Sequence, residues 1–121
     1  MTSWNPADLA AIDADGELHV AAHRPDGTLR TPRIVWHVVV DDALYLRSVR
    51  GTDGAWYRGV QRTGTGEIDA GGVRSEVTFT RDDAHDDAID RAYHAKYGGG
   101  SAVQAITSPA ATATTLRVEP R

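Results

Sequence analysis

The chain has 121 residues and an apolar content of 40%, which suits one globular domain spanning residues 1–121. It contains no cysteine, so disulfides, thiolate metal sites and a cysteine nucleophile are excluded. The net charge of −4 argues against a nucleic-acid partner, and no apolar run is long enough to suggest a membrane span. The first residues lack the basic and apolar regions of a signal peptide, so we expect a cytoplasmic protein.

The amino-terminal part of the chain predicts a short helix followed by a strand. Asn5 or Ser3 caps the helix, Pro6 occupies its first position, and residues 15–16 end it. Residues 17–24 then alternate between apolar and polar side chains, a pattern typical of a half-buried strand.

The clearest hairpin of the sequence follows. Residues 34–40 are apolar on both faces and predict a central strand, Asp41-Asp42 predicts a two-residue turn, and residues 43–49 predict the returning strand. Such a turn sets the register, so we expect Val38 to face Tyr45. The more apolar face, which we assign to the barrel interior, carries Val35, His37, Val39, Leu44 and Leu46. The other face is aromatic and amphipathic, which suits a ligand or a subunit interface, and carries Trp36, Val38, Tyr45 and Arg47.

The remaining sequence predicts two helices and three strands. Residues 55–61 predict a short helix capped by Thr52 or Asp53. Residues 67–70 and 73–80 predict a second hairpin around Gly71-Gly72.

Asp82 or Asp83 then caps a longer helix, which ends at Tyr97 before three glycines, and a mobile segment and a last strand over 113–118 follow. The order is α-β-β-β-α-β-β-α-β, which predicts an α+β domain. We expect about six mostly antiparallel strands to close into a barrel with flanking helices.

Histidines and acidic residues offer few chemical candidates. His19 and His23 share one face of a strand, but positions four apart in a strand lie roughly 13 Å apart, so we assign no metal site. His37 has apolar neighbours, so it is either a core histidine hydrogen-bonded to the backbone or a proton donor at a pocket wall. The acidic run over residues 82–87 fits the start of a helix, where the helix dipole favours carboxylates.

The best candidate site runs from residue 47 to residue 58. Arg47 and Arg50 lie at the end of a strand and lead into a helix amino terminus, where backbone amides attract anions. Trp36, Trp56 and Tyr57 are aromatic rings that can stack on a flat ligand. These residues predict either a site for a phosphate-bearing aromatic cofactor, or solvated arginines beside aromatic residues that belong to the core or to a dimer interface.

Several short motifs are spread along the chain: Trp4-Asn5-Pro6, Leu18-His19-Val20, Arg30-Thr31-Pro32, Tyr45-Leu46-Arg47, Trp56-Tyr57 and the closing run from Ile89 to Tyr97. Together they resemble a bacterial family, the domain of unknown function family 2255. This resemblance covers nearly the whole chain.

More distantly, Arg30-Thr31-Pro32 and the run from Ser48 to Trp56-Tyr57 resemble the deazaflavin-dependent nitroreductase family. That resemblance implies a split β-barrel related to flavin-binding oxidases, and a homodimer with the cofactor at the subunit interface. By position, Ser48, Arg50 and Gly51 would face the cofactor phosphate. The family has a proline before the tryptophan and an asparagine after the tyrosine, where this chain has Ala55 and Arg58.

These features lead to three hypotheses. The first is an oxidoreductase that uses FMN or a deazaflavin coenzyme on a small organic molecule, with Tyr57 or His37 as the proton donor. Its predicted cofactor-binding residues are Arg33, Trp36, Arg47, Ser48, Arg50, Gly51 and Trp56. Arg33 is included because the hairpin register makes it a neighbour of Arg47. The second is a cofactor-free enzyme of the cyclase or isomerase type, or a ligand-binding protein, that uses the same pocket. The third is a dimeric binding module without catalysis.

Overall fold

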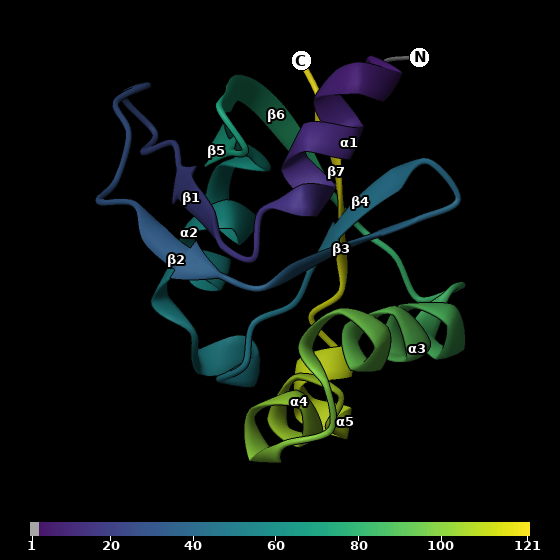
Figure 1. Ribbon diagram of the computed structural model, residues 1–121. Helices are drawn as coiled ribbons and strands as arrows, with labels where there is room; N and C mark the ends of the chain where they lie inside the picture. Colours follow the sequence, from purple (N-terminus) through teal and green to yellow (C-terminus); the bar gives the residue numbers. More distant parts are fainter. Residues whose placement is uncertain (1–2) are drawn as a thin grey trace.

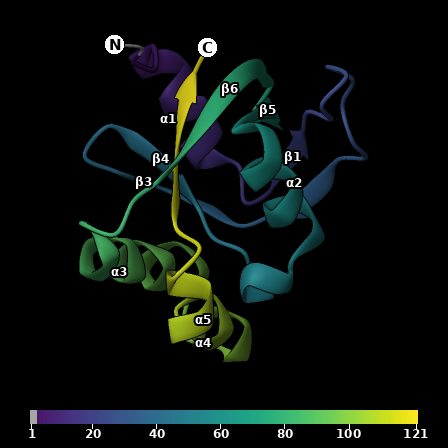
Figure 2. The same cartoon turned by 180° about the vertical axis from the view of Figure 1, so that it is seen from behind.

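The computed structural model describes residues 3–121 and shows a curved antiparallel sheet with helices around it (Figures 1 and 2). The elements in chain order are α1 (Pro6–Ala14), β1 (Leu18–Ala22), β2 (Arg33–Val35), β3 (His37–Val40), β4 (Ala43–Leu46), the 3₁₀ helix η1 (Gly51–Asp53), α2 (Ala55–Thr63), β5 (Thr65–Ala70), β6 (Val73–Arg81), α3 (Asp86–Tyr97), α4 (Ser101–Ile106), α5 (Pro109–Thr112) and β7 (Leu116–Pro120). The predicted α+β class is confirmed.

The sheet is a nearly closed split barrel. Its strand order is β2-β1-β5-β6-β7-β4-β3, and every pairing is antiparallel. The two edge strands, β2 and β3, follow each other in sequence with only Trp36 between them. The prediction of one central strand over residues 34–40 is therefore wrong. The segment is divided at Trp36 into two edge strands, of which β2 pairs with β1 at one end of the sheet and β3 pairs with β4 at the other, and this gives seven strands.

Both predicted hairpins form. Asp41 and Asp42 have φ angles of 50° and 64°, which suits a two-residue turn of the kind that matches strand twist. Val38 faces Tyr45 as the register predicts. The β4 strand ends at Leu46, three residues earlier than predicted, and the backbone N–H of Ser48 turns to donate to Thr114 Oγ1 at 2.8 Å.

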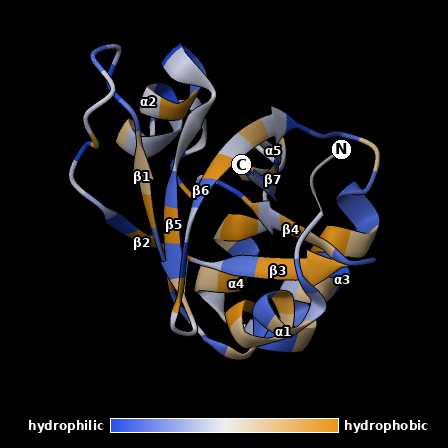
Figure 3. Ribbon diagram, turned by 90° about the horizontal axis from the view of Figure 1, so that it is seen from above, coloured by the Kyte–Doolittle hydropathy of each residue, from blue (hydrophilic) through white to orange (hydrophobic). Residues whose placement is uncertain are grey.

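Two apolar clusters hold the barrel and its helices together. The assignment of the more apolar hairpin face to the barrel interior is confirmed, because Leu44 and Leu46 lie in the main core with Ile68 and Val118. The aromatic face is divided, because Trp36 and Arg47 line a pocket that is described below whereas its other two residues are buried. Val38 and Tyr45 pack against helices α3 and α4 of the same chain, in the cluster with Ile89, Tyr93 and Ile106. Figure 3 shows apolar residues along β3 and β4 beside α3.

The ends of the helices agree with the prediction at α1 and differ elsewhere. Asn5 caps α1 by accepting a hydrogen bond from the backbone N–H of Ala7 at 2.9 Å. Neither Thr52 nor Asp53 caps α2, because both belong to η1 and the N-cap residue is Gly54.

Two further boundaries lie later in the chain than predicted. Helix α3 starts at Asp86, because the Asp82 carboxylate accepts from the backbone N–H of Ala84 in a turn that precedes the helix. The segment predicted as mobile folds into α4 and α5, since Val103, Ile106 and Ala111 are buried. The last strand starts at Leu116 rather than at residue 113.

The β5–β6 turn offers a matched test of packing against α1. Gly71 and Gly72 have φ angles of 59° and 80°, so alanine is strained at both positions. Only at Gly71 would a Cβ atom collide with the backbone carbonyl of Ala11 in α1. We expect Gly72→Ala to cost about 1 kcal/mol of unfolding free energy and Gly71→Ala about 3 kcal/mol or more, as measured by urea denaturation. Equal costs would show that α1 does not pack on this turn.

Candidate functional site

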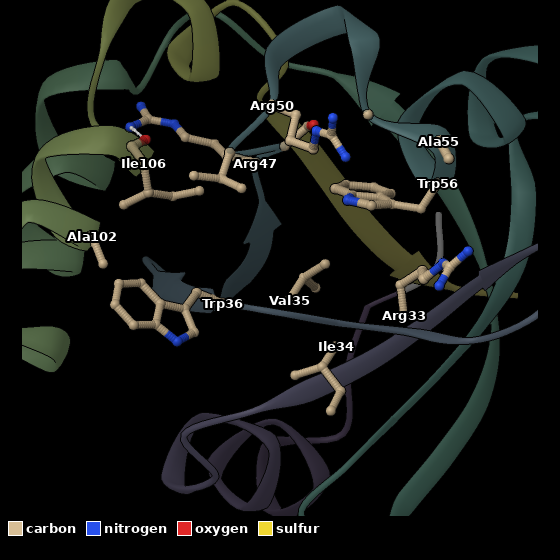
Figure 4. Close-up of a pocket in the computed structure, with 13 residues that line it drawn as sticks. Arg33, Ile34, Val35, Trp36, Arg47, Arg50, Ala55, Trp56, Ala102 and Ile106 are labelled. Carbon is tan, nitrogen blue, oxygen red and sulfur yellow. Dashed lines mark hydrogen bonds between the residues drawn. The ribbon is translucent and has the colours of Figure 1, made fainter.

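A pocket of about 530 Å³ opens between β2, the β4–α2 connection and α4 (Figure 4). Its walls come from three segments that lie far apart in sequence: Arg33, Ile34, Val35 and Trp36; Arg47, Ser48, Val49, Arg50, Gly54, Ala55 and Trp56; Ala102 and Ile106. The pocket gathers all the predicted cofactor-binding residues except Gly51. Gly51 is buried beside the pocket, where its φ of 64° and its contact with Ala110 of α5 shape the connection.

One end of the pocket is polar and cationic. Arg33 and Arg50 are exposed, and their guanidinium groups flank the half-buried indole of Trp56 in Figure 4. The amino terminus of α2 opens here, because its N-cap residue Gly54 and its first residues line the pocket. No side chain in the described range 3–121 caps this helix end, and its first turn has no acidic residue. Its free N–H groups and dipole therefore favour an anion.

A buried hydroxyl group lies at the same end. Ser48 is 1% exposed, and its Oγ has no hydrogen-bond partner among residues 3–121. A Cβ atom at Gly54 would collide with this oxygen, so Ser48 lies directly against the start of α2. A buried hydroxyl without a partner costs free energy, which a polar ligand group would recover.

Arg47 lines the pocket, but its guanidinium group is held by other partners. It donates to the Asp90 carboxylate of α3 and, at 2.8 Å, to Thr115 Oγ1, and it lies over the Tyr93 ring at 5.6 Å. The side chain of Arg47 is fully buried, and Figure 4 shows the guanidinium turned towards the helices. The role of Arg47 in binding a phosphate stays a prediction, while its positive charge is balanced inside the protein.

The other end of the pocket is apolar. Trp36, Ala102 and Ile106 gather there, away from Arg33 and Arg50 (Figure 4). The Trp36 indole is stacked on the Tyr97 ring of α3, with centroids 4.1 Å apart and planes 10° apart. Sequence reasoning missed Ala102 and Ile106 because they fall in the segment predicted as mobile. The spacing of Val103 and Ile106 by three residues was the available signal of a helix.

The two predicted proton donors do not line the pocket of this chain. Tyr57 is 3% exposed, belongs to the main core, and its hydroxyl accepts from Gln61 Nε2 at 3.3 Å. His37 is fully buried, and its Nε2 lies 2.7 Å from the backbone carbonyl oxygen of Ile12. Lys96 Nζ lies 3.2 Å from the same nitrogen. Because a carbonyl oxygen only accepts, the shorter contact requires the hydrogen on Nε2, and Lys96 then does not donate to it. This contact agrees with the first of the two alternatives for His37, a core histidine bonded to the backbone. Catalysis by either residue remains untested.

His37 makes folding sensitive to pH. Burial lowers the pKa of His37 below its ordinary 6.5, and the Lys96 ammonium nearby lowers it further. The unfolded chain then binds a proton at a higher pH than the folded chain does. We expect the unfolding free energy to fall as the pH drops through about 6.5 towards 5, above the range where most carboxylates titrate.

The variant His37→Gln provides the control, because glutamine keeps an N–H donor and does not titrate. Denaturation curves at several pH values should show a shallower slope for this variant than for the native chain. The same slope in both proteins would contradict a buried neutral His37.

Residues 8–118 match the family model described as an uncharacterized protein conserved in bacteria, DUF2255. The chain belongs to this family. No curated protein matches the chain. The DUF2255 assignment confirms the family indicated by the sequence motifs.

Solved structures with the same fold include proteins of several kinds. The heme storage protein HutZ from Vibrio cholerae has a TM-score of 0.70 at 10% identity, over 98% of this chain and 91% of that one. An F420 reductase has a TM-score of 0.57 at 18% identity, over 93% and 91% of the two chains. A FAD-binding protein from Mesorhizobium loti has a TM-score of 0.56 at 12% identity, over 98% and 91%. At these identities the likeness shows that this DUF2255 protein shares their fold.

Proposed function

We propose that this DUF2255 protein binds a phosphate-bearing, flavin-type cofactor in the pocket, either FMN or a deazaflavin coenzyme. We propose that it acts with this cofactor as an oxidoreductase on a small organic molecule. The observation that most strongly supports this proposal is that the buried hydroxyl of Ser48, which has no hydrogen-bond partner among residues 3–121, lies against the uncapped amino terminus of α2. Free backbone N–H groups, a hydroxyl and nearby guanidinium groups are the donors that a phosphate requires.

The rest of the pocket suits the ring system of such a cofactor. Its volume of about 530 Å³ lies within the usual range for cofactor sites. Trp56 offers an aromatic surface beside Arg33 and Arg50, where a flat ring can stack. A bound cofactor of this class would supply hydride transfer. The protein would bind its phosphate through Ser48 and Arg50, orient its ring and exclude water.

Two of the three related structures support the proposal of a flavin-type ligand. One is an F420 reductase and one is a FAD-binding protein, whereas HutZ is a heme storage protein. The pocket residues of the described chain include no histidine, cysteine, methionine or tyrosine that could be an axial ligand of heme iron. The pocket therefore favours a flavin-type cofactor over heme.

The absorption spectrum of the purified protein tests the proposal. It should be recorded alone, with FMN and with the deazaflavin coenzyme. We expect one of the two cofactors to show a shifted visible band that saturates with protein concentration. If neither cofactor binds, the cofactor-free pocket becomes the better hypothesis, and the next step is to search for a bound metabolite by mass spectrometry.

We also propose a homodimer, because two large apolar side chains are exposed at the edge of the pocket. Ile34 is 56% exposed and Val49 is 55% exposed, and both line the pocket. The double variant Ile34→Asp with Val49→Asp should shift the protein from dimer to monomer in sedimentation velocity. The control is Leu29→Asp, at an exposed apolar residue outside the pocket, which should leave the dimer intact. A native chain that sediments as a monomer would contradict the homodimer.

A further inference from the structure

We infer that the apolar end of the pocket is the substrate subsite, that it takes a neutral, planar, apolar molecule, and that Ala102 on α4 limits its size. This inference rests on the proposed function, because it assigns the polar end to the cofactor phosphate. It adds the substrate class and a residue that determines specificity.

The charges of the pocket are divided between its ends. Arg33 and Arg50 lie at the Trp56 end, whereas Trp36, Ala102 and Ile106 form the opposite end (Figure 4). Among the described residues that line the pocket, the third charged residue is Arg47, whose guanidinium group is turned towards the helices and balanced by Asp90. A charged group of a ligand would lose its hydration at this end without gaining an ionic partner. A neutral molecule is therefore favoured.

The wall formed by Trp36 is rigid and flat. Its indole is stacked on Tyr97, whose hydroxyl is itself fixed, because it donates to the Gly16 carbonyl at 2.9 Å and accepts from the backbone N–H of His37 at 3.2 Å. Aromatic rings prefer stacked or edge-on partners, so a wall of this kind favours a planar molecule.

Ala102 is the smallest side chain at this end. It is exposed, and its helix is anchored by buried Val103 and Ile106, so a larger residue at position 102 should not disturb the fold. A phenylalanine at this position would occupy space that the substrate needs. Gln104 is the matched control, because it is exposed on the same helix and does not line the pocket.

The test compares the native protein with Ala102→Phe and Gln104→Phe. Each protein is saturated with the cofactor that binds it, as read from the absorption band. It is then titrated by calorimetry with 2-naphthol, a neutral planar probe, and with 2-naphthoate, its anionic counterpart. We expect the native protein to bind 2-naphthol about tenfold or more tightly than 2-naphthoate. Ala102→Phe should lower the affinity for 2-naphthol at least about tenfold, and Gln104→Phe should not change it.

The two readouts separate the inference from the proposed function. The inference is overturned if 2-naphthoate binds as well as 2-naphthol, or if Ala102→Phe leaves 2-naphthol binding unchanged. It is also overturned if Ala102→Phe abolishes the cofactor band, because α4 would then border the cofactor. If no protein binds either cofactor, the proposed function fails. A loss of 2-naphthol binding by Ala102→Phe alone would still support an apolar subsite at α4 in that case.

Discussion

Replacing Asp90 by alanine is expected to lower the free energy of unfolding by about 3 kcal/mol. The substitution removes the carboxylate that accepts a hydrogen bond from Arg47 Nη1, and the Arg47 side chain is fully buried. The nearest other carboxylate, on Asp86, lies 3.8 Å from Arg47 Nη2 and replaces only part of the lost interaction. A buried charge without its partner is one of the most destabilising changes in a small domain. Urea denaturation at neutral pH measures the effect.

Two controls identify the cause. Asp87→Ala removes an exposed carboxylate from the first turn of the same helix and should cost less than about 1 kcal/mol. Asp90→Ala should also cost less than about 1 kcal/mol when Arg47 is already methionine, because the buried charge is then absent. Additive costs in the double variant would show that the two side chains are not coupled.

Arg50→Ala is expected to weaken cofactor binding by about ten- to a hundredfold, the loss expected for a hydrogen bond to a charged group. Arg50 is exposed and reaches the polar end of the pocket, so the substitution removes a phosphate donor without disturbing the core. Ser48→Ala should weaken binding about five- to tenfold, because the phosphate would lose the hydrogen bond that the buried hydroxyl is proposed to donate. Titration of the visible absorption band with FMN or the deazaflavin coenzyme measures both affinities.

Arg58 and Arg47 provide the contrasts for this experiment. Arg58 is an exposed arginine of α2 outside the pocket, so Arg58→Ala should leave the affinity unchanged. Arg47→Met should change the free energy of unfolding and have a smaller effect on cofactor affinity, because the guanidinium group of Arg47 is balanced by Asp90. Equal affinity losses at Arg50 and Arg58 would point to a general charge effect. Full affinity without Arg50 would remove it from the proposed phosphate site.

Elements that depend on neighbouring residues could be predicted from the sequence. The cap at Asn5, the two-residue turns at 41–42 and 71–72, and the alternation that points Leu44 and Leu46 inwards all follow from short-range geometry. Arg47, Arg50 and Trp56 of the pocket were predicted for the same reason, whereas Ser48 was predicted through the resemblance to the deazaflavin-dependent nitroreductase family. They lie within ten residues of each other in the sequence, where a strand leads into a helix.

The sequence by itself determined the secondary structure class, the two hairpins, the interior face of the barrel and most of one pocket wall. Only the tertiary structure decided that residues 33–40 divide at Trp36 into the two edge strands, that Asp90 balances Arg47 and that α4 completes the pocket. Each of these depends on partners that lie tens of residues away in the chain. The pattern of residues 34–40 predicts that both faces are covered, which holds at His37 and Val38 but not at the exposed Ile34, and it does not show which strands or helices cover them. The strand partners of this segment depend on how the barrel closes, and its helix partners depend on the packing of α3 and α4 against β3 and β4.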